Sequence, residues 1–245
     1  GYEIPFYKDG RTATVSVRRT IDGFVTLATN GKPDASMERE WMDTSRLNVG
    51  RRQLRRDIAT QLLLPVITLA HAPQARNVAV IGHGSGMSSH VLLGSPHISE
   101  AVTIEIEPEM INASEVFRPA NARVFDDERS TFVIDDARSY FASARRKFDL
   151  ILSEPSNPWV SGVSGLFTHE FYAEIRDQLA PNAVFGQWLH LYELNDPLVT
   201  SVMAAIDRVF PFYEVFFTSN SDILIVAAVH TLREPSWDVI QYPGI

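Results

Sequence analysis

The sequence of 245 residues contains no cysteine, no long apolar run and no excess of basic residues. Because it has no cysteine, the chain can form no disulfide, no thiolate metal site and no cysteine nucleophile, and its composition is compatible with a reducing cytoplasm. No stretch reaches the roughly 18 apolar residues of a membrane-spanning helix, and no signal peptide is visible. The chain begins with Gly1 rather than methionine, which is compatible with a processed or excised piece of a longer protein.

Positive charge is scarce, since 22 Lys and Arg stand against 30 Asp and Glu and the net charge is −8. Nucleic-acid binding needs clustered Lys and Arg, because these side chains release counterions from the phosphates. We interpret the basic cluster RRQLRR at 51–56 as the solvated face of a helix. The sequence therefore predicts no nucleic-acid partner.

Residues 1–50 carry the pattern of a small antiparallel β unit. Apolar side chains alternate over 12–17, and a second apolar run follows at 24–27. The dipeptides Asp22-Gly23 and Asn30-Gly31 are typical of tight turns. We therefore predict two short antiparallel strands in this part of the chain.

Helical and apolar stretches alternate in the rest of the sequence. Residues 53–70 repeat apolar side chains at helical spacing, and we expect Pro65 to kink or end that helix. The amphipathic stretch 168–180 predicts another helix. The apolar runs are NVAVIGHGSG (77–86), EAVTIEIE (100–107), TFVIDD (131–136), FDLILSE (148–154) and AVFGQWL (183–189). Strands that alternate with helices predict βαβ units and a parallel sheet that is covered on both faces.

The end of the chain follows a different pattern. The runs FYEVFFT (212–218) and DILIVAAV (222–229) are joined only by SNS, which is too short for a crossover, so they must form an antiparallel hairpin. A parallel sheet that finishes with such a hairpin is the layout of the class I methyltransferase-like, Rossmann-like α/β fold. We predict that residues 51–245 form a Rossmann-like nucleoside-binding catalytic domain, preceded by the small β unit at 1–50.

Three glycines, Gly82, Gly84 and Gly86, end the first parallel strand, where backbone without side chains can approach a ligand. A dinucleotide fingerprint requires Gly or Ala where this chain has Met87, so the spacing favours a nucleoside without a pyrophosphate, such as S-adenosylmethionine. A tight turn alone would also explain these glycines. His83 lies within the loop, where it could contact the ligand, although a lone histidine is more often structural.

Carboxylates end the next two predicted strands. Glu105 could accept both hydrogen bonds of a ribose diol, and Glu107 competes for this role because alternate residues of a strand face opposite sides. Asp135 and Asp136 close the third strand, where a carboxylate could accept from the adenine amino group. Each could instead be an exposed acid at a strand end. Their recurrence on one edge of the sheet favours a ligand site.

The stretch DLILSEPSNPW at 149–159 ends the fourth parallel strand beside the glycine loop. Glu154 is the acid that ends this strand, and Asn157 could bond its own loop or a ligand amine. Pro155 stiffens the backbone after the acid. Trp159 precedes the glycine-containing VSGVSG, which resembles a lid over a pocket. Alternatively, Glu154 is a solvated loop acid and Trp159 a core residue.

Together, IGHGSG, IEIEPEMI, IDDARSYF, FDLILSEPSNPW with GLFTHEFY, and GQWLHLYEL at 186–194 resemble motifs of the spermidine synthase (polyamine aminopropyltransferase) family. The segment SEPSNPW is most similar to that of a divergent branch of the family, whose members are often fused to membrane-spanning segments. The resemblance implies catalytic residues Glu154 and Asn157; nucleoside-binding residues Gly82, His83, Gly84, Ser85, Gly86, Glu105, Asp135, Asp136 and Ala137; and lid or substrate residues Pro155, Trp159, Gln187 and Tyr192. The seven histidines are scattered, and no metal site is predicted.

The chain departs from the family pattern at amine-binding positions. The family has aspartates where this chain has Glu154, Asn157 and Ser85, and its tyrosine-histidine-glutamate triplet falls near Asp57-Ile58-Ala59. An aspartate at the position of Ser85 would repel the carboxylate of S-adenosylmethionine, because like charges at close range cost free energy. The hypothesis is that the pocket accepts the adenosyl sulfonium, including its carboxylated form, and has lost affinity for a long polyamine.

The resemblance implies a transferase that binds S-adenosylmethionine or its decarboxylated form as substrate and displaces methylthioadenosine, with a small amine as acceptor and no metal. The alternatives are intramolecular cyclisation to methylthioadenosine and a lactone, a methyltransferase, and a non-catalytic nucleoside sensor. We expect a cytoplasmic protein, either free or as the cytoplasmic domain of a membrane protein. A homodimer and attachment to a membrane domain outside this chain are further expectations.

Overall fold

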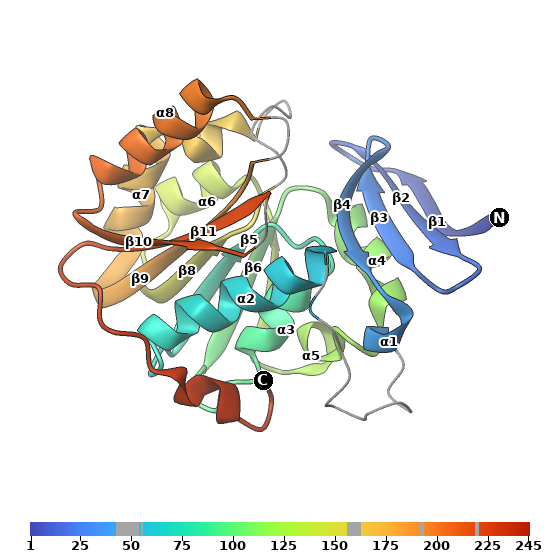
Figure 1. Ribbon diagram of the computed structural model, residues 1–245, viewed down its shortest axis with the longest axis horizontal. Coiled ribbons are helices and arrows are strands. Elements are labelled where there is room, and N and C mark those ends of the chain that lie inside the picture. Colours follow the sequence, from blue (N-terminus) through green and yellow to red (C-terminus); the bar gives the residue numbers. More distant parts are fainter. Residues whose placement is uncertain (43–53, 55, 156–162, 192–193, 219–220) are drawn as a thin grey trace.

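The computed structural model of the protein describes residues 1–42, 54, 56–155, 163–191, 194–218 and 221–245 (Figure 1). It contains a four-stranded antiparallel sheet and a larger seven-stranded sheet. The basic cluster at 51–56 lies almost wholly outside the described residues. In the described part of the chain, no helix is long and apolar enough to cross a membrane.

The N-terminal sheet has twice the number of strands that the sequence predicted. Its strands follow one another in space in chain order: β1 (Tyr2–Asp9), β2 (Thr14–Thr20), β3 (Val25–Thr29) and β4 (Lys32–Met37). The turn at Asn30-Gly31 is confirmed, because both residues have positive φ, 50° and 80°, as a tight hairpin requires. The short helix α1 (Arg39–Met42) follows the sheet. The buried face of β2 to β4 packs against Ile58 of α2 and Met110 of α4.

The seven-stranded sheet confirms the predicted class I methyltransferase-like fold. Its spatial order is β10-β11-β9-β8-β5-β6-β7. Strands β7, β6, β5, β8 and β9 pair in parallel, and β9, β11 and β10 pair antiparallel. The bounds are β5 (Asn77–Ile81), β6 (Glu100–Glu105), β7 (Ser130–Ile134), β8 (Phe148–Ser153), β9 (Leu179–His190), β10 (Phe212–Phe217) and β11 (Asp222–Ala228).

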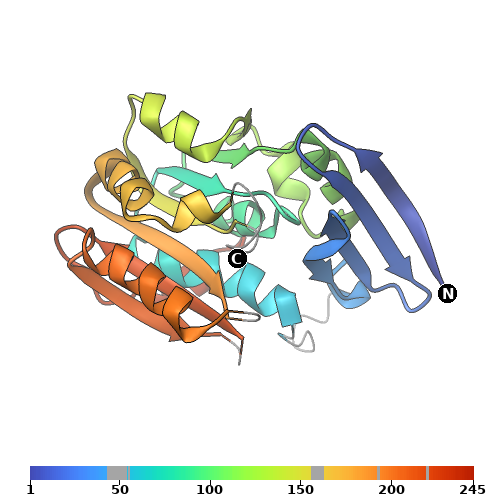
Figure 2. The same ribbon diagram turned by 90° about the horizontal axis from the view of Figure 1, so that it is seen from above.

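Helices cover both faces of this sheet, as Figures 1 and 2 show. On one face, α2 (Arg56–His71), α3 (Met87–Leu92) and the 3-10 helix η5 (Trp237–Gln241) share a core with β5, β8, β9 and β11. On the other face lie α6 (Ala137–Ser143), α7 (His169–Gln178) and α8 (Asp196–Asp207). The remaining short helices are α4 (Pro108–Ser114), η3 (Glu115–Phe117), α5 (Ala122–Asp126) and η4 (Ser164–Phe167).

Helix α2 does not end at Pro65, contrary to one of the two outcomes that the sequence predicted, and continues to His71. A proline inside a helix leaves the carbonyl four residues earlier without its usual N–H donor. That carbonyl belongs to Gln61, and the hydroxyl oxygen of Ser88 in α3 lies 3.4 Å from it. A neighbouring helix thus places a possible donor within reach of the carbonyl that the proline leaves without one.

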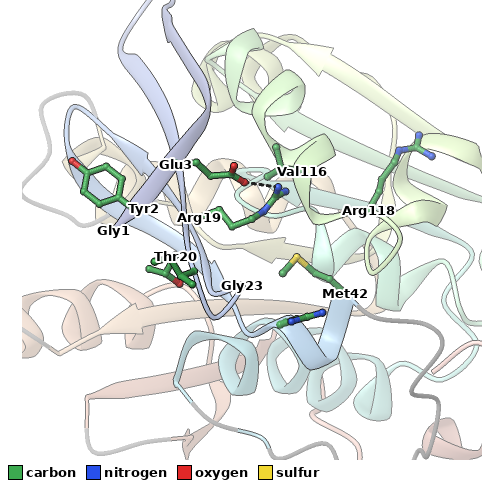
Figure 3. Close-up of a pocket in the computed structure, with 11 residues that line it drawn as sticks. Gly1, Tyr2, Glu3, Arg19, Thr20, Gly23, Met42, Val116 and Arg118 are labelled. Carbon is green, nitrogen blue, oxygen red and sulfur yellow. Dashed lines mark hydrogen bonds and ion pairs between the residues drawn. The ribbon is translucent and has the colours of Figure 1, made fainter.

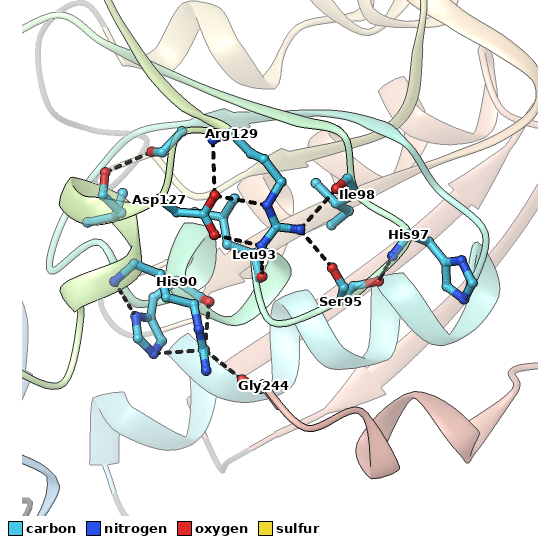
Figure 4. Close-up of polar contacts among 11 residues, drawn as sticks. His90, Leu93, Ser95, His97, Ile98, Asp127, Arg129 and Gly244 are labelled. Carbon is cyan, nitrogen blue, oxygen red and sulfur yellow. Dashed lines mark hydrogen bonds and ion pairs between the residues drawn. The ribbon is translucent and has the colours of Figure 1, made fainter.

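Arginine side chains fix the loops at the amino ends of the strands (Figure 4). Arg129 donates to the Asp127 carboxylate and to the carbonyls of Leu93, Ser95 and Ile98, at 2.5 to 3.0 Å. Arg123 donates to the carbonyl of Gly244 at 2.6 Å and so holds the C-terminal residues. These contacts order the edge of the sheet that lies opposite to the glycine loop.

Candidate functional site

The glycine loop joins β5 to α3 at the carboxyl edge of the sheet. Gly82, Gly84 and Gly86 have φ values of 86°, 52° and 80°, which other residues adopt only with strain. A Cβ at Gly82 would lie 2.6 Å from the backbone oxygen of Glu154. The loop is therefore in close contact with the end of β8. Glycine is required at Gly82 both for its conformation and for this approach.

Glu105, at the end of β6, faces the glycine loop and is 7% exposed. Its carboxylate accepts from the backbone N–H of His83 and of Glu107, each at 2.9 Å. Burial raises the pKa of Glu105 to about 7; hydrogen bonds from backbone N–H groups lower it, and the nearby Asp34 carboxylate raises it. Each carboxylate oxygen can accept a further hydrogen bond.

Glu107, the competing candidate, faces the N-terminal sheet instead. Its Oε2 accepts from the backbone N–H of Thr12 at 2.6 Å, from the Thr12 hydroxyl at 2.8 Å and from the Ala13 N–H at 3.1 Å. Its Oε1 accepts from the N–H of Glu109 and caps α4. Glu107 therefore has a structural role, and Glu105 is the acid beside the loop.

The side chain of His83 packs behind the loop. Its Nε2 lies 2.6 Å from the hydroxyl of Ser114, and its ring meets Phe125 and Phe132 edge-on. Burial lowers the pKa of His83 to about 3, so the imidazole is neutral. The group of His83 that contacts Glu105 is its backbone N–H.

Ser85 begins a chain of buried polar contacts that leads to the N-terminal sheet. Its hydroxyl donates to Oε1 of Gln61 at 2.5 Å. Gln61 donates to the backbone oxygen of Ser36 in β4 at 3.2 Å, and the Ser36 hydroxyl donates to Asp57 at 2.5 Å. The sequence did not identify Gln61 or Ser36, because each is isolated in its stretch and only the packing of α2 brings them to the loop.

Glu154 follows β8 and is partly buried. Its Oε2 accepts from the hydroxyl of Ser88, in the first turn of α3, at 2.5 Å. Burial raises the pKa of Glu154 to about 7; the Ser88 hydrogen bond lowers it, and the Asp57 carboxylate raises it. A carboxyl with a pKa near 7 can accept a proton at neutral pH. Pro155, which follows it, is buried.

The end of β7 places its two acids in different roles. Asp135 accepts from the N–H of Asp136 at 2.8 Å, and its own N–H donates to the carbonyl of Glu105 at 3.1 Å. Asp136 caps α6 by accepting from the N–H of Ser139 at 3.1 Å. Ala137, the first residue of α6, is buried. The strand ends of β6 and β7 are thus directly linked.

Gln187 is fully buried in β9, where its register partner in β8 is Ser153. Its side-chain amide donates to the carbonyls of Ser153 at 3.3 Å and Trp188 at 2.7 Å. It therefore supports the backbone that leads into Glu154.

Three of the predicted site residues, Asn157, Trp159 and Tyr192, lie outside the described residues. In the ranges that the structure does describe, no group of three or more His, Cys, Asp or Glu could hold a metal ion.

A hollow of about 670 Å³ lies beside the N-terminal sheet (Figure 3). Its lining includes Tyr2, Arg39, Met42 and Val116, and an ion pair of 2.9 Å between Glu3 and Arg19. None of the predicted site residues lines it. The carboxyl edge around the glycine loop remains the candidate site.

Comparison with known proteins gives matches at both the sequence and the fold level. Residues 58–221 match the family described as the spermine/spermidine synthase domain. The polyamine aminopropyltransferase of Caldicellulosiruptor bescii is 28% identical over 154 residues, which are 63% of this chain and 55% of the relative. The chain thus spans about half the length of the curated relatives it matches.

Solved structures share the fold. A spermidine synthase in complex with the transition state analogue AdoDATO has a TM-score of 0.77 and 21% identity, over 94% of this chain and 74% of that one. Human methyltransferase-like protein 13, in complex with SAH, has a TM-score of 0.54 and 21% identity, over 76% of this chain and 86% of that one. At these identities the likeness concerns the fold alone.

Proposed function

Because the chain belongs to the spermine/spermidine synthase domain family, we propose that it is an aminopropyltransferase-like enzyme that uses an adenosyl sulfonium as substrate. The observation that carries this proposal is the position of Glu154, whose backbone lies against Gly82 of the glycine loop and whose carboxyl accepts from the Ser88 hydroxyl at 2.5 Å. Burial raises the pKa of this carboxyl to about 7. A general base works best when its pKa lies close to the operating pH.

The nucleoside would bind along the carboxyl edge of the sheet. The glycine loop from Gly82 to Gly86 would contact the ligand through its backbone, and Glu105 would accept from the ribose hydroxyls. Asp135, with Asp136 and Ala137, would bind the adenine. One solved structure that shares the fold is a spermidine synthase in complex with the transition state analogue AdoDATO.

The charges around the site favour cationic reactants. Asp34 acts on Glu105 and Asp57 acts on Glu154, so four carboxyl groups gather around the loop. A sulfonium and an amine are both attracted by such a field. The decarboxylated form of S-adenosylmethionine, with its extra ammonium and no carboxylate, is therefore our first choice of substrate.

In the proposed reaction, the lone pair of the acceptor amine attacks the aminopropyl carbon attached to sulfur. The carbon–sulfur bond breaks, its electron pair stays on sulfur, and methylthioadenosine leaves. The amine proton goes to Glu154. Since the sulfonium is already a good leaving group, the protein contributes mainly by orienting the reactants and removing the proton. The acceptor side would include Pro155, Gln187, Asn157, Trp159 and Tyr192.

A second candidate is intramolecular cyclisation of S-adenosylmethionine itself, in which its own carboxylate attacks the same carbon and gives a lactone. Ser85 favours this variant, because its side chain is neutral and its hydroxyl is engaged with Gln61. Position 85 therefore carries no negative charge that would repel the carboxylate of the ligand.

Product analysis tests the proposal. The protein and its Glu154→Gln variant are incubated with decarboxylated S-adenosylmethionine plus putrescine, and separately with S-adenosylmethionine. We expect methylthioadenosine and an aminopropylated amine from the first mixture, with product formation at least about 100-fold slower in the variant, since general bases contribute roughly 10² to 10⁴. A lactone would support cyclisation. S-adenosylhomocysteine would indicate a methyltransferase, and binding without any product would indicate a sensor.

We further propose that residues 51–245 form the nucleoside-binding unit and residues 1–50 a separate β unit. The cytoplasmic location, the homodimer and the attachment to a membrane domain stay predictions from the family resemblance.

A further inference from the structure

The hydroxyl of Ser88 lies between two acceptors. Its Oγ is 2.5 Å from Oε2 of Glu154 and 3.4 Å from the carbonyl oxygen of Gln61. Ser88 is 4% exposed, so water does not compete strongly for this hydroxyl. Because a hydroxyl carries one hydrogen, it donates to only one of the two acceptors at a time.

The carbonyl of Gln61 is available because of Pro65. In a helix, the carbonyl of residue 61 accepts from the N–H of residue 65. Pro65 has no N–H, and it lies inside α2. The proline therefore leaves an acceptor facing α3, and the hydroxyl of Ser88 is within reach of it.

We propose that Ser88 is a positioning residue that holds the carboxyl of Glu154 in both its ionised and its protonated form by reversing its hydrogen bond. When Glu154 is ionised, Ser88 donates to it. When Glu154 has taken a proton, the carboxyl O–H donates to Oγ of Ser88, and Ser88 turns its own hydrogen to the Gln61 carbonyl. Both protons stay on their oxygens during this exchange. The inference rests on the proposed role of Glu154 as base.

Two elements act on the Glu154 carboxyl among the described residues. Helix α2 contributes the Asp57 carboxylate, which disfavours ionisation, and α3 contributes the neutral Ser88 hydroxyl. From the glycine loop, Gly82 packs against the backbone of Glu154. A hydrogen bond to a carboxylate is stronger than one between neutral groups, so on balance Ser88 favours the ionised, basic form.

The first test follows the pH dependence of kcat/KM in three variants. In Ser88→Ala, loss of the donor should move the acidic limb to higher pH by about one unit. Transfer at pH 7 should fall about fivefold, since the ionised fraction falls from about a half to about a tenth. Ser88→Thr keeps the hydroxyl and should restore the wild-type limb. Ser89→Ala is the matched control, because its hydroxyl contacts Thr103 instead.

The second test does not depend on turnover. The side-chain carboxyl of Glu154 is titrated by NMR in protein labelled with ¹³C-glutamate, and the signal is assigned by its loss in Glu154→Gln. A midpoint that rises in Ser88→Ala and returns in Ser88→Thr supports the inference even if no aminopropyl transfer is found. An unchanged midpoint overturns it, whatever the activity. If Ser88→Ala does not fold, Ser88→Cys, a weaker donor, should show a smaller rise, and an unchanged midpoint there has the same meaning.

Discussion

At the scale of single residues, Glu105 and Glu154 are held where ionisation is unfavourable. Burial raises the pKa of each to about 7, and one lies on each side of the glycine loop. An acid whose pKa is raised by folding opposes folding at a pH where it is charged. Carboxyls with strongly perturbed pKa values cluster at functional sites.

Replacing Glu154 by glutamine should therefore stabilise the protein while it slows the proposed transfer. The folded pKa of about 7 exceeds the ordinary 4.5, so the carboxyl opposes folding fully above pH 7 and not at all below pH 4.5. We expect Glu154→Gln to raise the free energy of unfolding by about 3 kcal/mol at pH 8 and to have no effect near pH 4. Urea unfolding at both pH values measures this.

Glu170→Gln provides the control for this effect, because Glu170 is exposed at the start of α7. It should change stability by less than about 0.5 kcal/mol at either pH. Equal stability of Glu154→Gln and wild type at pH 8 would mean that the Glu154 carboxyl is not disfavoured in the folded protein.

At the scale of elements, hydrophobic pattern predicted the parallel strands and missed half of the N-terminal sheet. Strands β5, β6 and β8 are buried along nearly all their length and, like β9, stand out as apolar runs, whereas β7 at the edge of the sheet is only partly buried. In contrast, β1 is exposed along nearly all its length and contains Pro5, and β4 begins with the polar Lys32-Pro33-Asp34. These strands form because they pair with neighbours, which a local pattern does not record.

The candidate site divides in the same way. Gly82, Glu105 and Glu154 were predictable, because the ends of parallel strands meet at one edge. Ser88 and Gln61 were not, since their contacts depend on how α2 and α3 pack against each other. The sequence around Ser88 and Gln61 shows only helical spacing. Pro65, which frees the Gln61 carbonyl, predicted only that the helix would kink or end.

The packing of α2 on the sheet predicts one glycine at which substitution is costly. A Cβ at Gly186 in β9 would meet the Thr68 hydroxyl of α2 and would lie 2.8 Å from Cδ2 of Leu152. Gly186→Ala should lower the free energy of unfolding by about 1–3 kcal/mol, because overpacking a filled interior forces neighbours apart. Gly165→Ala is the control, since its Cβ would meet only the flexible Arg138 side chain, at 3.3 Å. Thermal unfolding of the two variants compares them, and equal midpoints would contradict this close packing.

At the scale of the whole molecule, the two sheets are joined by contacts that also reach the site. The N-terminal sheet contributes Ser36 and Asp34, which act on Asp57 and Glu105 respectively. Glu107 fixes this arrangement, because it accepts three hydrogen bonds from Thr12 and Ala13 while it caps α4. The ionisation of the site therefore depends on how the N-terminal sheet is held.

Glu107→Gln tests this connection. Burial raises the pKa of Glu107, but hydrogen bonds from Thr12, Glu109 and Ala13 outweigh it, so the pKa lies below its ordinary 4.5. A lowered folded pKa means that the charge stabilises the fold above pH 4.5 and ceases to do so as the pH falls through the folded pKa.

We expect Glu107→Gln to lose about 1–3 kcal/mol of unfolding free energy at pH 7, and the difference to shrink below pH 4.5. Glu109→Gln, which removes the ion pair to the exposed Lys8 and disturbs the hydrogen bond from Asn112, should lose less than about 1 kcal/mol. Urea unfolding at pH 7 and pH 4 measures both variants, and equal losses at pH 7 would show that Glu107 does not hold the two sheets together.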